Sequence, residues 1–289
     1  MSREQAVQKV SDDPLSTSQP VVLLLLDGWG VAPESEGNAI SPENSKNFLK
    51  LLSEYPAGTL NVKDASESKR YASLGASGHF STFLNSQKIK QAYLAESEKS
   101  SAVLGSFVGP ENISQVENRV ISSPICDSYE LEPEMSLEEL SRAAIKIIRE
   151  GSYRFILISV ANLDAVAFSG DVQATKKALS RVDSFLGKIT EEVLLKKGIL
   201  VVSSAGGNAE QMFDVRTELV DRGNTLNPVP FLIIGEDYKG LSLFGADAPG
   251  GDLTLLNTIG SLEDVPVTIL NLMNIERPDG FVGKNLLEQ

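Results

Sequence analysis

Four short, predominantly apolar runs stand out along the chain, and none of them shows a regular alternation of apolar and polar residues. They are residues 21–26, 155–160, 199–202 and 229–234. Strands that consist of continuous apolar residues are typical of a parallel sheet that is covered on both faces. The runs therefore predict the buried strands of a parallel sheet.

Helical patterns lie between these runs. In residues 136–150 the apolar positions fall on one stripe, and Ser136 with Glu139 three residues later predicts a capped helix start. A second helix is predicted over residues 172–197. Residues 96–118 are rich in Ser, Gly and Glu without a clear period, and we expect a loop or an edge strand there. The alternation of strands and helices predicts an α/β fold, a doubly wound, mainly parallel sheet with helices on both faces.

The chain of 289 residues is acidic, with a formal net charge of −13. Because it has no excess of basic residues, we expect neither a nucleic acid nor a membrane surface as its partner. The most apolar run has six residues, which is too short to cross a bilayer. The single cysteine, Cys126, excludes an internal disulfide and fits the cytoplasm or another reducing compartment.

The first nineteen residues differ in character from the rest of the chain. They are polar and lack the apolar stretch of a secretory signal. We expect residues 1–19 to be a disordered polar arm and residues 20–289 to form a single domain.

Polar residues follow the predicted strands, where the functional loops of such sheets gather. Asp27 follows the first run and Asp164 follows the second. Either aspartate could bind a hard cation, but an ordinary turn or helix-cap role is the more common one for a single aspartate. A site for two cations needs several carboxylates and imidazoles, yet the only histidine is His79. Gly206 and Gly207, after the third run, lack the residues of a phosphate-binding loop and favour a structural turn.

Six longer phrases carry a more specific signal. They are residues 21–30 (VVLLLLDGWG), 37–40 (GNAI), 95–99 (AESEK), 133–136 (PEMS), 207–212 (GNAEQM) and 227–231 (NPVPF). In their order and approximate spacing they resemble the cofactor-independent (2,3-bisphosphoglycerate-independent) phosphoglycerate mutases of the alkaline phosphatase superfamily. The resemblance covers residues 20–287 and implies an alkaline-phosphatase-like fold.

The resemblance also implies two domains, a metal-bearing phosphatase-like domain and a transferase domain inserted into it. The insertion should begin shortly after residues 87–93, but the sequence passes almost directly to residues 95–99, which follow the insertion in the family. We therefore expect the transferase domain to be missing. Because that domain helps to hold the phosphoglycerate, its loss removes part of the substrate positioning.

Four site positions of the family are retained, according to this resemblance. Asp27 and Asp164 match metal ligands, and Lys99 matches a lysine near the reacting phosphoryl group. Ser77 matches the nucleophilic serine, in a phrase whose flanking residues differ from those of the family. The resemblance thus implies a vestigial site at the carboxyl end of the sheet.

The other site positions are changed. Phe168 stands in place of a histidine, Ala205 and Gly206 replace an Asp-His pair, and Asn224 replaces another histidine. Phenylalanine cannot coordinate a metal ion, and an Ala-Gly pair offers no ligating side chain. The family uses two divalent cations, typically manganese, but for this chain we expect no cofactor. We also expect Phe168 to fill part of the vestigial cleft.

These changes favour a pseudoenzyme, a phosphoglycerate-mutase-like chain without catalytic activity that acts as a binding or scaffolding domain for a protein partner. One alternative is a residual metal-dependent phosphatase or phosphoglycerate mutase, with phosphoryl transfer through Ser77. Its site would be rearranged around Asp27, His79 and Asp164 or completed by another chain. The other alternative is a phosphate-ester sensor that binds its ligand through Ser77 and Lys99.

Overall fold

The computed structural model describes most of the chain. The described residues are 19–64, 66–76, 79–108, 116–214, 216–217, 219–221, 223–243 and 251–288. The predicted arm, except Gln19, and the predicted nucleophile Ser77 lie outside them. The division into residues 1–19 and 20–289 stays a prediction.

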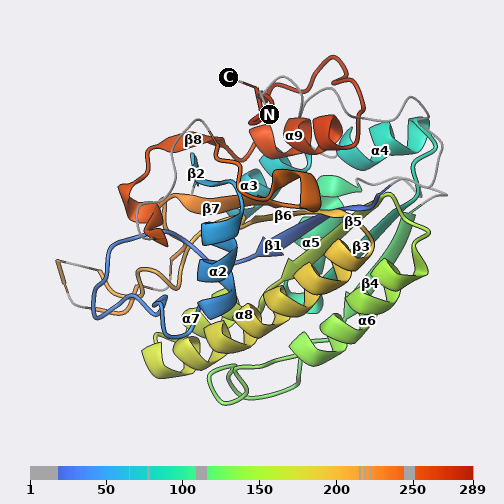
Figure 1. Cartoon of the computed structure of the whole chain (residues 1–289). Helices are drawn as coiled ribbons and strands as arrows, with labels where there is room; N and C mark the ends of the chain where they lie inside the picture. The colour runs from blue at the N-terminus through green and yellow to red at the C-terminus, as the bar shows by residue number, and fades with distance from the viewer. Residues whose placement is uncertain are drawn as a thin grey trace.

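The described residues form an eight-stranded sheet with the strand order β4-β3-β5-β1-β6-β7-β2-β8 (Figure 1). The strands are β1 Val21–Leu26, β2 Ala57–Asn61, β3 Gln91–Glu96, β4 Val116–Ile121, β5 Phe155–Val160, β6 Ile199–Ser203, β7 Val229–Ile234 and β8 Thr258–Ser261. All neighbouring pairs are parallel except those of β7, which is antiparallel to β6 and to β2. The four predicted strands and the mainly parallel sheet are confirmed. The reversal of β7 was not predicted, because an apolar run does not reveal the direction of a strand.

Helices cover both faces of the sheet, as predicted (Figure 1). They are α2 Lys46–Glu54, α3 Glu67–Leu74, α4 His79–Ser86, α5 Ser97–Phe107, α6 Leu137–Glu150, α7 Asn162–Ala167, α8 Val172–Leu195 and α9 Asp264–Leu272, with short 3-10 helices at η2 Glu236–Tyr238 and η4 Leu253–Leu255. Successive side chains of β1 point to opposite faces, so Val22 and Leu24 pack with α2, α6, α7 and α8, whereas Leu23 and Leu25 pack with α3, α4, α5 and α9. The sheet is thus buried between two apolar layers.

The two predicted helices are present, with small corrections. Helix α6 begins after Ser136, but the Ser136 hydroxyl donates to the carbonyl of Ser122 at 2.5 Å and does not cap the helix. Helix α8 is capped by Asp171, the residue before its first turn, whose carboxylate accepts a hydrogen bond from the amide of Ala174 at 2.9 Å. No helix in the described part of the chain is both long enough and apolar enough to span a membrane.

The segment predicted as a loop or edge strand contains both a helix and a strand. Residues 97–107 form α5, whose Val103 and Phe107 are fully buried, and β4 lies at the edge of the sheet. The loop prediction was wrong for α5 because serine and glycine weaken its helical pattern, and packing against the sheet supplies the missing stability. This helix places Lys99 in its first turn, directly after the end of β3.

The carboxyl ends of β1, β5 and β6 meet at one edge of the sheet. The amide of Gly28 donates to the carbonyl of Gly206 at 3.0 Å, and the amide of Asp164 donates to the carbonyl of Asp27 at 3.1 Å. These backbone bonds join the loops that follow three neighbouring strands. The edge predicted to carry the site is therefore a tightly connected layer.

Candidate functional site

Asp27 is the central carboxylate of this edge, and it is 3% exposed. Its Oδ2 accepts hydrogen bonds from the hydroxyl of Tyr71 and, at 2.9 Å, from that of Ser159, and its Oδ1 accepts one from the amide of Ala205 at 3.3 Å. Burial raises the pKa of the Asp27 carboxyl, while the charge of Lys99 and the Tyr71 hydrogen bond oppose that rise. Both oxygens of Asp27 are thus already bound by groups of the chain itself.

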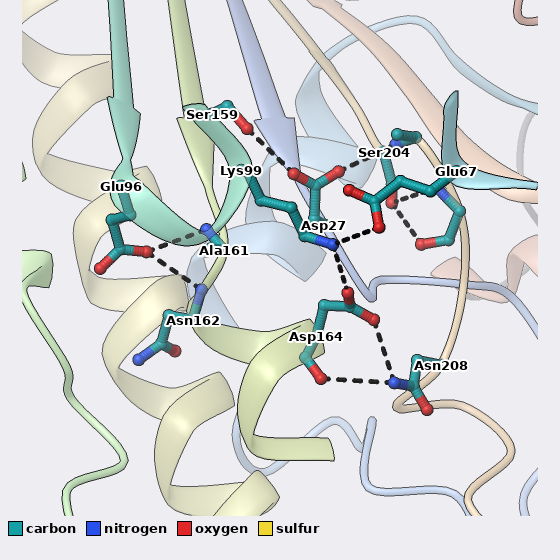
Figure 2. Close-up of polar contacts among 12 residues, drawn as sticks. Asp27, Glu67, Glu96, Lys99, Ser159, Ala161, Asn162, Asp164, Ser204 and Asn208 are labelled. Atoms are coloured by element: carbon teal, nitrogen blue, oxygen red, sulfur yellow. Dashed lines mark hydrogen bonds and ion pairs between the residues drawn. The ribbon is translucent and has the colours of Figure 1, made fainter. Parts of the chain in front are cut away.

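Lys99 lies among three carboxylates (Figure 2). Its Nζ is 2.8 Å from Oδ2 of Asp164 and 3.1 Å from Oε2 of Glu67, and its side chain is 10% exposed. Burial by itself would lower the pKa of Lys99, but Asp164 and Asp27 outweigh burial and raise it above its ordinary value. The ammonium therefore stays charged and balances the acidic groups of the site.

Asp164 is held on its other side by an amide. It lies in the first turn of α7, and its Oδ1 accepts a hydrogen bond from Nδ2 of Asn208 at 3.0 Å (Figure 2). The start of α7 is held by Glu96, whose Oε2 accepts hydrogen bonds from the amides of Ala161 at 2.9 Å and Asn162 at 3.1 Å. Two residues of the AESEK phrase, Glu96 and Lys99, therefore fix the position of α7 and its aspartate.

The phrases around Gly30 and Gly207 also have a structural role. They surround Glu210, which is 1% exposed and whose Oε1 accepts hydrogen bonds from Thr225 and from Asn227. A Cβ atom on either glycine would collide with the carboxyl group of Glu210. Burial raises the pKa of Glu210, and the hydrogen bonds from Thr225 and Asn227 oppose the rise. The two glycines are therefore required to accommodate a buried carboxyl group.

One face of α3 covers the site, and this contribution of α3 was not predicted from the sequence. Glu67, Arg70 and Tyr71 are spaced i, i+3 and i+4, so their side chains leave the helix on the same face. Glu67 contacts Lys99, Tyr71 binds Asp27, and Arg70 lies so close to Gly206 that a Cβ there would collide with its Nη1. The spacing was visible in the sequence, but the loops that this face would meet were not.

The four positions whose residues differ from the family ligands have different surroundings. Phe168 is 54% exposed, so the expectation that it fills the cleft was wrong, and Tyr71 and Lys99 contact the aspartates instead. Ala205 is buried and Gly206 faces Arg70, whereas Asn224 is only half-buried. The lone histidine, His79, is exposed at the start of α4. Asp27 and Asp164 are brought together as predicted.

The described side chains do not fit the paired cation site of the family. Among them, no group of three or more His, Cys, Asp or Glu residues is arranged to hold a metal ion. The ammonium of Lys99 contacts Asp164, and three donors of the chain occupy Asp27. Two cations need more anionic or imidazole ligands than these two aspartates supply.

Sequence comparisons place the chain in a family of metalloenzymes. The family model described as the Metalloenzyme superfamily matches residues 19–277. The 2,3-bisphosphoglycerate-independent phosphoglycerate mutase of Ehrlichia ruminantium (strain Gardel) is 33% identical over 260 residues, which are 89% of this chain and 47% of that protein. The enzyme of the same name from Clostridioides difficile (strain 630) is 30% identical over 256 residues, 88% of this chain and 47% of that protein.

Solved structures show the same fold. A phosphoglycerate mutase from Leishmania mexicana has a TM-score of 0.60 and 23% identity, covering 70% of this chain and 38% of its own. An alkaline phosphatase superfamily protein from Vibrio parahaemolyticus has a TM-score of 0.63 and 14% identity, covering 99% of this chain and 76% of its own. The alkaline phosphatase of the Antarctic bacterium TAB5 has a TM-score of 0.60 and 11% identity, covering 90% of this chain and 98% of its own.

These relationships contradict the expectation that the chain uses no cofactor. The matching family is one of metalloenzymes, and the similar Leishmania mexicana enzyme was solved at low cobalt concentration. The expectation rested on the changed ligand positions alone, and a count of ligands in one chain does not override the chemistry of its family.

The chain spans about half the length of the curated relatives that it matches. Residues 91–96 form one continuous strand, β3, where the sequence analysis placed the missing insertion. The partial coverage is consistent with the absence of the inserted domain. From its sequence match and its alkaline-phosphatase-like fold, the chain belongs to the Metalloenzyme superfamily, as a relative of the 2,3-bisphosphoglycerate-independent phosphoglycerate mutases.

Proposed function

We propose that this chain is a catalytically inactive relative of the phosphoglycerate mutases that acts as a binding domain for another protein. The observation that carries the proposal is the ion pairing of Lys99 with Asp164 and Glu67, next to Asp27, which accepts three hydrogen bonds from the chain. Two of the side chains that match the mutase site, Lys99 and Asp164, are instead bound to each other.

Phosphoryl transfer depends on donors and charges that face the group being transferred. Lys99 could provide such a charge, but its ammonium is shared between two carboxylates at 2.8 and 3.1 Å. Asp27 accepts three hydrogen bonds from within the chain. Stabilising a developing negative charge here would require these contacts to break. The uninterrupted strand β3 adds support, because an inserted domain at this position would help to hold the substrate.

Exposed apolar side chains near the α7 end of the site support a protein partner. Phe168 is 54% exposed after α7, and Leu219 and Val220 are 68% and 42% exposed. Val220 lies against Gly170, which joins these two loops. Apolar side chains that gather on a surface mark protein interaction sites more often than isolated ones do. We call Phe168, Leu219 and Val220 the apolar rim.

The absence of catalysis is tested by assaying the purified chain for phosphoglycerate mutase and phosphatase activity, with and without added Mn²⁺. We expect no turnover above that of a Ser77→Ala variant prepared in the same way. The full-length Clostridioides difficile enzyme serves as the positive control. Turnover that disappears in Ser77→Ala would contradict the proposal and support the phosphotransfer alternative.

The binding role is tested on the apolar rim. A protein partner that binds the wild-type chain should bind the double variant Phe168→Ser, Leu219→Ser at least about tenfold more weakly, or not at all. Leu195→Ser is the matched control, because Leu195 is 70% exposed at the end of α8 and is not part of the rim. Equal binding by the double variant and the control would exclude the rim as the interface.

A further inference from the structure

Arg70 differs from its two neighbours on the covering face of α3. Glu67 is paired with Lys99 and Tyr71 with Asp27, whereas Nε and Nη1 of Arg70 are buried without a hydrogen-bond partner in the described structure. The residue is 3% exposed. A guanidinium does not lose its proton in a protein, so the chain here buries a permanent positive charge.

No described carboxylate forms an ion pair with this guanidinium. The charge of Arg70 does act on the carboxylate of Asp64. The pKa of Asp64 is lowered mainly by the hydrogen bond from Lys69 and, to a smaller extent, by the charge of Arg70. The Asp64 carboxylate is already 2.8 Å from Nζ of Lys69. A buried charge without a counter-ion is strongly unfavourable, so an anion that reached Arg70 would be held firmly.

Arg70 lines a small pocket at the carboxyl ends of β2 and β8. Two further cationic side chains, Lys63 and Lys69, line this pocket together with the carboxylates of Asp64 and Glu263, and its volume is about 30 Å³. That volume is large enough for a water-sized group, so the pocket has room for an oxygen atom of a larger anion. The side chains of Lys63 and Lys69 are 61% and 71% exposed, and each is paired with one carboxylate, Glu263 and Asp64 respectively.

We infer that this pocket binds a phosphate or sulfate group, with one terminal oxygen beside Arg70 and the others at the opening near Lys63 and Lys69. The cationic groups come from α3 and from the segment after β2, and a tetrahedral anion presents oxygens in several directions at once. None of Asp27, Lys99 and Asp164 lines this pocket, although Arg70 also lies against Gly206 beside the Asp27 centre. The inference goes beyond the proposed function and does not depend on it.

The test is calorimetric titration of the full chain with inorganic phosphate and, separately, with sulfate and acetate at constant ionic strength. We expect saturable binding of phosphate and sulfate, weaker binding of acetate, and a loss of about tenfold or more in phosphate affinity in Arg70→Gln. Arg181→Gln, which changes an exposed arginine of α8, should bind phosphate like the wild type. Phenyl phosphate in competition with inorganic phosphate distinguishes a free anion from an esterified phosphate as the occupant.

Unchanged phosphate affinity in Arg70→Gln would overturn the inference, and so would the absence of saturable binding by the wild type. If Arg70→Gln does not fold, as judged by circular dichroism, Lys63→Gln with Lys69→Gln provides the second test. Both lysines are at the opening, and their joint replacement should also weaken phosphate binding. None of these titrations measures turnover, so their outcome is independent of whether the chain is catalytically inactive.

Discussion

Replacing Lys99 by methionine is expected to lower the free energy of unfolding by about 3–5 kcal/mol, as measured by urea denaturation. The substitution keeps an unbranched side chain of similar length but removes the ammonium that contacts Asp164 and Glu67. Asp164 is 13% exposed as a side chain and Asp27 is buried, so water cannot replace the lost charge effectively. The remaining carboxylates would repel one another across a poorly hydrated site.

The same interaction predicts a pH dependence. Because the pKa of Lys99 is raised in the folded chain, its stabilising contribution is fully present below the ordinary value of 10.5 and is lost as the pH rises through the folded-state value. The wild type should therefore lose this part of its stability at alkaline pH, and Lys99→Met should not. Lys177→Met, at an exposed position of α8, is the control. A loss below about 1 kcal/mol in Lys99→Met would show that the ion pairs behave as solvated surface pairs.

Replacing Gly28 by alanine should destabilise the chain by about 2–5 kcal/mol, because two penalties add. The backbone of Gly28 has a φ of +87°, and a Cβ there would lie 2.6 Å from the amide nitrogen of Asp164. That nitrogen donates to the carbonyl of Asp27, so the added methyl group would push apart the loops that hold the two aspartates. Urea denaturation measures the stability change.

The control for Gly28→Ala is a glycine in open space. Gly105 lies in α5, and a Cβ added there would meet nothing within 4 Å. Gly105→Ala should therefore leave stability unchanged or raise it by up to about 1 kcal/mol, because alanine favours a helix over glycine. If the two variants lost equal stability, the close approach of Gly28 to Asp164 would not be the cause.

Several of the sequence phrases that resemble the mutases stabilise the fold, and this role is independent of catalysis. Glu96 holds the start of α7, and Gly30 and Gly207 make room for the buried Glu210. Gly28 allows Asp164 to approach Asp27. A phosphotransferase and an inactive relative would need these contacts equally. For this reason the proposed inactivity rests on the ion pairs of Lys99 and the hydrogen bonds of Asp27, and not on the sequence phrases that resemble the mutases.

The sequence by itself determined the parts of the protein that depend on local pattern. Continuous apolar runs identified β1, β5, β6 and β7, since strands buried on both faces carry few polar residues. Helical spacing identified α6 and α8, and the position of Asp27 and Asp164 after their strands placed both at one edge. The same reasoning could not recover α5, whose serine-rich pattern is weak until it packs on the sheet.

Only the tertiary structure decided which side chains complete the site. Glu67, Arg70 and Tyr71 come from α3, and Tyr71 lies 44 positions along the chain from the Asp27 that it binds. Local spacing shows that these three share a helix face, but it carries no information about what that face meets. The choice of Lys99 as counter-ion and the exposure of Phe168 were decided in the same way, by how α3, α5 and α7 pack around the strand ends. Contacts between distant segments depend on the whole packing arrangement, which no single stretch of sequence contains.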